Sequence, residues 1–195
     1  MKIFDISQEL LSCKVYDGDP EPKIEALKSM NDGDLYNLSA LSLCLHNGTH
    51  IDAPRHFIKN GMTVDEIPIS TLVGVCYVAE HQGNVTASDA IEILKKAQKE
   101  NATERILLKG DLTVTEEAAK EFAKAGILLL GNESQSIGPE DAPMAVHLAL
   151  LTKGIILLEG IVLTDIKEGK YILNAAPLNI KCAEGSPCRA WLAEI

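Results

Sequence analysis

The stretch "RILLKGDLTVTEEAAKEFAKAGILLLGN", residues 105–132, decides how the chain is expected to fold. Its two ends, "RILLKG" and "ILLLGN", are short apolar runs of the kind that form buried strands. Between them, "TEEAAKEFAKAG" spaces its apolar residues as an amphipathic helix does. A strand, a helix and a strand in this order favour two parallel strands that are joined by a crossover helix.

The same alternation extends to both sides of this stretch. "SDAIEILKKAQKEN" (88–101) predicts a helix with Ser88 as a candidate N-cap, and "EDAPMAVHLALLTKG" (140–154) predicts a helix that ends at Gly154. Further strands are predicted for "KIFDIS" (2–7), "LYNLSALSLCLHNGTHIDA" (35–53), "VGVCYVAE" (73–80), "IILLEGIVL" (155–163) and parts of the tail. We therefore predict a single compact α/β domain with a mixed sheet over residues 1–195.

The composition of the chain argues against several classes of function. Hydrophobic residues make up 46% of the chain and charged residues 24%, which is ordinary for a globular protein. The net charge of −10 argues against binding to nucleic acid or to an anionic membrane, because both need clustered lysine and arginine. We find no secretory signal, and the five cysteines form no C-x-x-C pair, so reduced thiols in a cytoplasmic protein are expected.

Three of the five histidines fall within "HNGTHIDAPRHF", residues 46–57. In a strand, alternate residues share a face, so His46, His50 and Asp52 are expected to project together. His50 and Asp52 would lie about 6.6–6.8 Å apart along the strand, but His46 would lie about 13 Å from His50, too far to share a metal easily. Gly48 can remove this difficulty, because glycine permits a bulge or a sharp bend.

Two other interpretations of this cluster exist. A helix would also place His46 and His50 on one face, but the Asn-Gly-Thr between them is a poor helix former, and the flanking residues alternate. The three histidines could also be chance residues on a polar sheet face. Their density in a chain with so few histidines instead favours a metal site, since imidazole and carboxylate groups bind zinc, manganese and iron.

Two distant residues could complete such a site. Glu159 lies inside an apolar run, where a carboxylate is costly unless it is paired or metal-bound. His147 lies on the apolar helix predicted just before that run. Taken alone, His147 could be a core histidine and Glu159 could reach water at a strand end. Together they offer an imidazole and a carboxylate from adjacent elements, which is what a second metal would need.

The motif resembles the H-x-G-T-H-x-D-x-P-x-H-F signature of the putative cyclase family of metal-dependent hydrolases. This family includes bacterial kynurenine formamidases and manganese-dependent isatin hydrolases. Similar text extends along nearly the whole chain, in "DIS", "YDGDP", "GMTVDEIPISTLVG", "HLALLTKGIILLEG" and "PLNIKCAEGSPCRA". The resemblance implies a swivelling β/β/α fold and a homodimer or homotetramer.

The resemblance also implies roles for individual residues. His46, His50 and Asp52 match the ligands of a first metal, and His147 matches the histidine of a second. Asp52 and Glu159 match carboxylates that touch both metals.

The resemblance implies roles for two further residues. His56 matches the catalytic acid/base, and it follows Pro54, where the regular strand is expected to end. Tyr16, in "YDGDP", stands where kynurenine formamidases usually have the tryptophan of a W-P-G-D motif that lines the substrate pocket. This difference does not alter the expected metal chemistry, but it changes which substrates the pocket is expected to bind.

These observations predict a metal-dependent hydrolase of C–N amide bonds. One or two divalent cations, with zinc expected and manganese as the alternative, would activate a water molecule for attack on the carbonyl. The leading substrate class is an N-formyl aromatic amine such as N-formylkynurenine. The alternatives are a cyclic amide such as isatin, a metal-binding protein or oxygenase with a His/His/Asp iron site, and a non-catalytic relative of the family.

Overall fold

The computed structural model describes residues 1–195 and has a nine-stranded mixed sheet at its centre. The strand order is β1-β13-β11-β5-β7-β9-β10-β4-β12. The central strands β5, β7, β9 and β10 are parallel, and the outer strands pair antiparallel. The strand bounds are β1 Ile3–Asp5, β4 His50–Asp52, β5 Val73–Glu80, β7 Arg105–Lys109, β9 Leu129–Asn132, β10 Ile156–Glu159, β11 Gly169–Asn174, β12 Gly185–Pro187 and β13 Trp191–Glu194.

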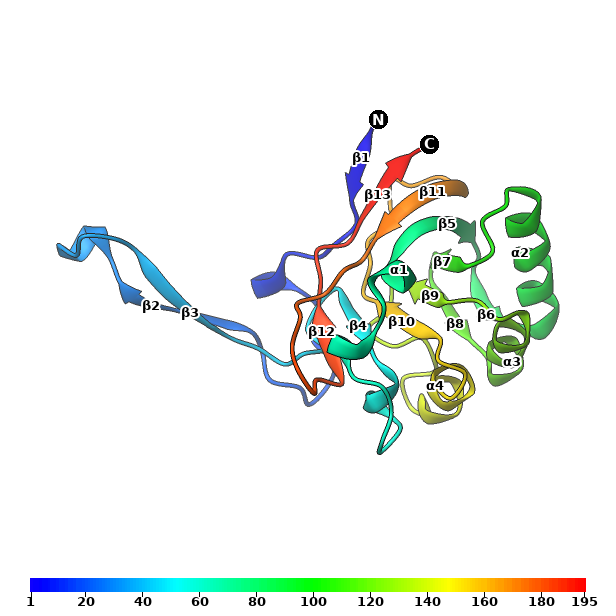
Figure 1. Ribbon diagram of the computed structural model, residues 1–195, viewed down its shortest axis with the longest axis horizontal. Helices are drawn as coiled ribbons and strands as arrows, with labels where there is room; N and C mark the ends of the chain where they lie inside the picture. Colours follow the sequence, from blue (N-terminus) through cyan, green and yellow to red (C-terminus); the bar gives the residue numbers. More distant parts are fainter.

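The α-helices that connect the parallel strands cover one face of the sheet (Figure 1). The α-helices are α1 Ile69–Leu72, α2 Ala87–Lys99, α3 Glu116–Ala125 and α4 Met144–Leu151, and the 3-10 helices are η1 Leu10–Ser12, η2 Met30–Asp32, η3 Pro54–His56 and η4 Val64–Glu66. A parallel pair, β6 Gly83–Val85 and β8 Leu112–Val114, lies beside α2 and α3. None of the helices has the length and apolar character needed to cross a bilayer.

The parallel strands are buried on both faces, as their continuous apolar runs predict. Ile106 and Leu108 of β7 pack into the core beneath the helices, around Phe122 of α3. Leu107, between them, packs into a second core on the other face of the sheet. The strand–helix–strand prediction for residues 105–132 is therefore confirmed, and so is the mixed α/β fold.

Several predicted boundaries are wrong. The N-cap of α2 is Thr86, not Ser88, because the Thr86 hydroxyl accepts from the Asp89 backbone N–H while the Asp89 carboxylate accepts from the Thr86 N–H. Strand β10 ends at Glu159, since Gly160 turns the backbone with a φ of +67°.

The predicted strand 35–53 is divided in two. Its first part is β3, Leu38–Ser42, which pairs with β2, Lys23–Lys28, in a hairpin that we call the arm. Figure 1 shows the arm extending away from the rest of the molecule. Its residues are exposed, including the cross-strand pair Ile24 and Leu41. The second part is β4, at the edge of the central sheet.

Candidate metal centre

A tight turn separates β3 from β4 and changes the position of His46. Gly48 has a φ of +64°, and a Cβ there would lie 2.9 Å from the Cβ of Cys13, so the turn both favours and requires glycine. The Asn47 side chain accepts from the Cys44 backbone N–H at 2.8 Å and holds the start of the turn. The bend predicted at Gly48 is thus present, and it folds His46 back toward β4.

Strand β4 carries two of the predicted ligands into the interior. His50 and Asp52 share one face, and both are almost completely buried, while Ile51 between them packs into the core on the opposite face. Strand β10 runs antiparallel to β4 and places Glu159 opposite His50. Helix α4 contributes His147, which is 3% exposed. Glu159 is buried, as the apolar run around it in the sequence predicts.

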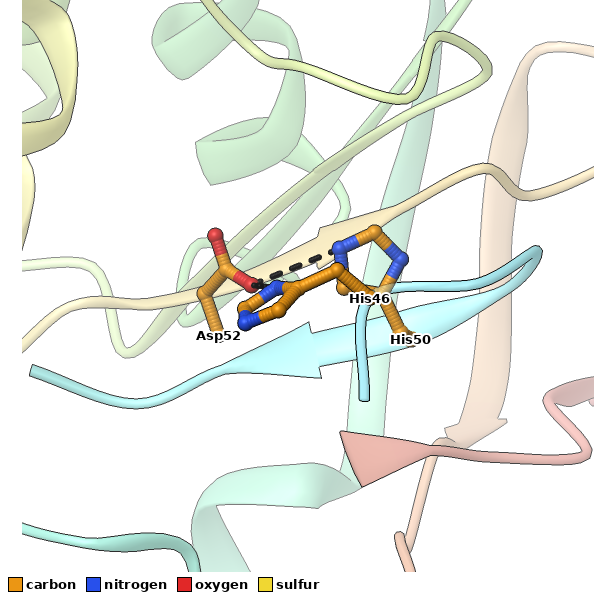
Figure 2. A group of neighbouring side chains, drawn as sticks. All are labelled: His46, His50 and Asp52. Carbon is orange, nitrogen blue, oxygen red and sulfur yellow. Dashed lines mark ion pairs between the residues drawn. The ribbon is translucent and has the colours of Figure 1, made fainter. Parts of the chain in front are cut away.

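The side chains form two groups that could each hold a metal ion. His46, His50 and Asp52 are one group, and Asp52, His147 and Glu159 are the other; within each, the ligand atoms lie within 4.8 Å of one another. His46 Nδ1 lies 2.8 Å and His50 Nε2 3.4 Å from Asp52 Oδ1 (Figure 2). His147 Nε2 lies 3.7 Å from Asp52 Oδ2. Asp52 therefore faces both groups, one with each oxygen.

Backbone groups fix the orientation of these ligands. His50 Nδ1 lies 2.9 Å from the Gly48 carbonyl, and His147 Nδ1 lies 2.8 Å from the Pro143 carbonyl. If each Nδ1 carries the proton and donates it, both Nε2 atoms are free to bind a cation, as is usual for metal-binding histidines. The Ile137 N–H donates to Glu159 Oε1 at 2.8 Å and orients that carboxylate.

The hydrogen-bonding of Asp52 tests whether a cation fits. Both Asp52 oxygens are buried without a hydrogen-bond partner, although imidazole nitrogens lie close by, and His46 Nε2 is also unpartnered. A buried carboxylate with no aligned donor is costly unless a cation compensates it. The donor set of three imidazoles and two carboxylates is one that zinc and manganese accept. The residues therefore fit a divalent cation.

The pKa shifts of these side chains show that the members of the two groups interact electrostatically. Burial lowers the pKa of His50, but Asp52 and Glu159 outweigh it and raise that pKa to about 10. The pKa of His147 is also raised, because Glu159 and Asp52 outweigh its burial. Burial raises the pKa of Asp52, but His46 and His50 outweigh it and hold the pKa well below its usual value. Without a cation, the site therefore keeps the Asp52 carboxylate ionised beside a protonated His50.

His56 differs from the other histidines of the motif. It ends the short helix η3 after Pro54, outside both groups, with its Nε2 3.9 Å from Asp52 Oδ2. Burial lowers its pKa, as do the neighbouring imidazoles of His46 and His147, although Asp52 opposes them. A neutral imidazole next to the candidate metal ligands can accept a proton at neutral pH.

A cavity of about 270 Å³ opens onto these groups. It is lined by Tyr16, Asp19, His46, His50, His56, Phe57, Gln135, Ser136, Pro143, His147 and Glu159. Tyr16 is one of these lining residues, and its hydroxyl donates to the Glu140 carbonyl at 2.9 Å.

Sequence reasoning missed several of these lining residues. Phe57 stacks on His147 with ring centroids 4.6 Å apart, and its place at the end of the motif was an available signal. Gln135 and Ser136 come from the loop between β9 and α4, where no sequence pattern marks them.

A model of the family described as "Putative cyclase" matches residues 4–139, more than half of the chain. The chain belongs to this family. The kynurenine formamidase of Erythrobacter litoralis (strain HTCC2594) is 30% identical over 207 residues, which cover 100% of this chain and 94% of that protein. That of Salinibacter ruber (strain DSM 13855 / M31) is 31% identical over 208 residues, covering 100% and 98%. The predicted membership of the putative cyclase family is confirmed.

Solved structures agree with this assignment. A protein described as a potential metal-dependent hydrolase with cyclase activity superposes with a TM-score of 0.82 at 27% identity, covering 100% of this chain and 99% of its own. Isatin hydrolase A from Labrenzia aggregata superposes with a TM-score of 0.83 at 22% identity, covering 98% and 93%. The second similarity concerns the fold alone.

Proposed function

We propose that this chain is a metal-dependent hydrolase that cleaves a C–N amide bond, with N-formyl aromatic amines as its leading substrates. The observation that carries the proposal is the position of Asp52, whose two unpartnered, buried oxygens face two groups of metal-binding side chains. The kynurenine formamidases that resemble the chain support the substrate class.

The two groups suggest one or two divalent cations per chain, with zinc expected and manganese as the alternative. His46, His50 and Asp52 would hold the first cation, and Asp52, His147 and Glu159 the second. Bound there, a cation would polarise the substrate carbonyl and lower the pKa of water toward neutrality.

His56 is proposed as the acid/base. Its lowered pKa leaves the imidazole neutral at pH 7, so it can accept a proton from the attacking water. The resulting imidazolium can then donate that proton to the leaving nitrogen. Because His56 lies outside both groups of ligands, it can act in this way without giving up a metal bond.

Tyr16 and Phe57 are proposed to bind the aromatic part of the substrate. Both line the cavity, and Phe57 is held against His147. A tyrosine ring offers a smaller apolar face than a tryptophan, so we expect weaker turnover of N-formylkynurenine than a tryptophan-containing formamidase shows, and a preference for smaller or more polar amides.

Formate release from formanilide under anaerobic conditions tests the proposal. Protein reconstituted with zinc or manganese should release formate and aniline in equal amounts, and chelation should abolish the reaction. Opening of isatin instead of formanilide cleavage would favour the cyclic-amide alternative. No hydrolysis of either compound by metal-loaded protein would contradict the proposal, and dependence on oxygen would favour an oxygenase.

We further propose that the chain forms a homodimer or homotetramer. The arm supports this, because a two-stranded hairpin is marginally stable in water unless something packs on it. Large apolar side chains are exposed along it: Ile24, Leu27, Met30, Leu35, Tyr36, Leu38 and Leu41. A second copy of the chain would cover such a surface.

A further inference from the structure

Outside the metal ligands and His56, the cavity lining holds two residues with buried, unsatisfied polar atoms: Ser136, through its hydroxyl, and Gln135, through both atoms of its carboxamide. Its Nε2 and Oε1 atoms are both buried, and neither has a hydrogen-bond partner. Gln135 lines the same cavity as His56 and Glu159. A buried amide without partners is destabilising, so a group that enters the cavity is expected to satisfy it.

The surrounding backbone holds Gln135 in place. The Gly160 N–H donates to the Ser134 carbonyl at 2.7 Å, and the Ile137 N–H donates to Glu159 Oε1 at 2.8 Å. In the sequence, Gln135 lies between Ser134 and Ile137, and these two hydrogen bonds join its loop to Gly160 and Glu159. The backbone at Gln135 is therefore held next to a proposed metal ligand.

Gly160 leaves room for this carboxamide. A Cβ at Gly160 would lie 2.2 Å from Gln135 Nε2, so any side chain there would displace the amide. Gln8 approaches the same glycine, but its amide is satisfied: Nε2 donates to the Gly160 carbonyl and Oε1 accepts from the Lys14 N–H, both at 2.8 Å. The two glutamines differ in that only Gln135 combines an unsatisfied amide with a place in the lining of this cavity.

We propose that Gln135 is a substrate-recognition residue whose Oε1 accepts the N–H of the scissile amide. This inference rests on the proposed amide hydrolysis. A secondary amide that enters the cavity loses water from both its carbonyl and its N–H. The cation site would take the carbonyl oxygen, and Gln135 offers an acceptor that no protein group uses. An ester has no N–H, so Gln135 selects amides over esters.

The test compares formanilide with phenyl formate, which differ in the N–H, on metal-loaded wild type and the Gln135→Met variant. Methionine keeps the length of the side chain and removes the amide. We expect kcat/KM for formanilide to fall by at least about tenfold, with a change below about twofold for phenyl formate. The matched control Gln8→Met should lower Tm and affect both substrates alike. An equal loss on both substrates in Gln135→Met would overturn the proposal, because a merely structural role has that effect.

A failure of the proposed amide hydrolysis can be distinguished from a failure of the Gln135 proposal. If wild type hydrolyses neither compound, amide hydrolysis is wrong, and binding of acetanilide and phenyl acetate, measured by calorimetry, tests Gln135 separately. A loss of at least about tenfold in acetanilide affinity alone, in Gln135→Met, would support N–H recognition. Equal losses, no loss, or no binding of acetanilide to wild type would overturn it.

Discussion

Glu159 of β10 lies opposite His50 of β4, with its Oε2 atom 3.5 Å from His50 Nε2. This pairing joins a residue of the histidine motif to one more than 100 positions away along the chain. Together with Asp52, Glu159 keeps the buried His50 protonated when no cation is present, since the pKa is raised to about 10. Cation and proton therefore compete for the same imidazole nitrogen.

This competition predicts proton release when metal binds. A cation binds neutral imidazole, and His50 is protonated at any pH below about 10 in the metal-free protein, so binding near pH 7.5 should release at least about one proton per chain. Affinity should therefore rise with pH up to about 10. Calorimetric titrations in two buffers of different ionisation enthalpy measure the released protons. Equal heats in both buffers would show that no proton is displaced and would contradict this account of His50.

The raised pKa of His50 also predicts how the stability of the metal-free fold depends on pH. The pKa is higher in the folded chain than the ordinary 6.5, so this group stabilises the fold fully below pH 6.5 and loses that contribution as pH rises toward 10. A cation replaces the proton, so metal should stabilise the fold most at high pH. Thermal unfolding with metal and with chelator, between pH 7 and 10, should show a growing difference in Tm. A shrinking difference would argue against the site.

The His56→Ala variant tests the proposed acid/base role of His56 separately from metal binding. Because His56 lies outside both metal groups, the variant should keep its metal and its fold but lose about 10²–10⁴-fold in hydrolytic rate. Metal content and formanilide turnover are measured on the same preparation. Near-normal activity would mean that His56 only ends the η3 helix, and loss of metal would make it a ligand.

Tyr16→Trp tests the aromatic wall of the cavity. The larger ring should improve kcat/KM for N-formylkynurenine by about two- to tenfold, which corresponds to about 0.5–1.5 kcal/mol of added aromatic contact. Tyr16→Phe is the control, because it removes only the hydroxyl that donates to the Glu140 carbonyl. No gain in the tryptophan variant, with full activity in the phenylalanine variant, would show that the ring does not contact the substrate.

The arm should control assembly. Ile24 and Leu41 lie opposite each other on β2 and β3 and are 59% and 50% exposed. The double variant Ile24→Lys, Leu41→Glu replaces this apolar pair with a cross-strand ion pair that the hairpin can keep. Light scattering should give a multiple of 21.1 kDa for wild type and a shift toward monomer for the variant. Ile69→Lys, an exposed apolar position outside the arm, should leave assembly unchanged. A wild-type monomer would contradict the proposal.

The second half of the chain could be predicted well because its patterns are local. Continuous apolar runs such as β7 and amphipathic runs such as α3 specify their own structure, and neighbouring elements then pack in sequence order. The residues brought together at Asp52 could also be expected, since few explanations other than a metal site account for so many histidines in one motif.

Other features depend on contacts that no local pattern records. Residues 35–53 alternate as one strand would, yet Gly48 turns the chain and leaves the first part exposed on the arm. The N-cap moved from Ser88 to Thr86 because Thr86 pairs reciprocally with Asp89. Gln135 could not be identified, because an isolated glutamine in a loop becomes notable only when tertiary packing buries its amide without a partner.

Metal content of three variants tests the central claim most directly. Elemental analysis after reconstitution with zinc or manganese should give about two cations per wild-type chain when both sites fill, about one in His147→Ala, and almost none in Asp52→Asn, because Asp52 belongs to both groups. His81→Ala, a histidine outside both groups, is the control and should match wild type. Formanilide hydrolysis should disappear with the metal in Asp52→Asn. Full metal content in that variant would contradict the account.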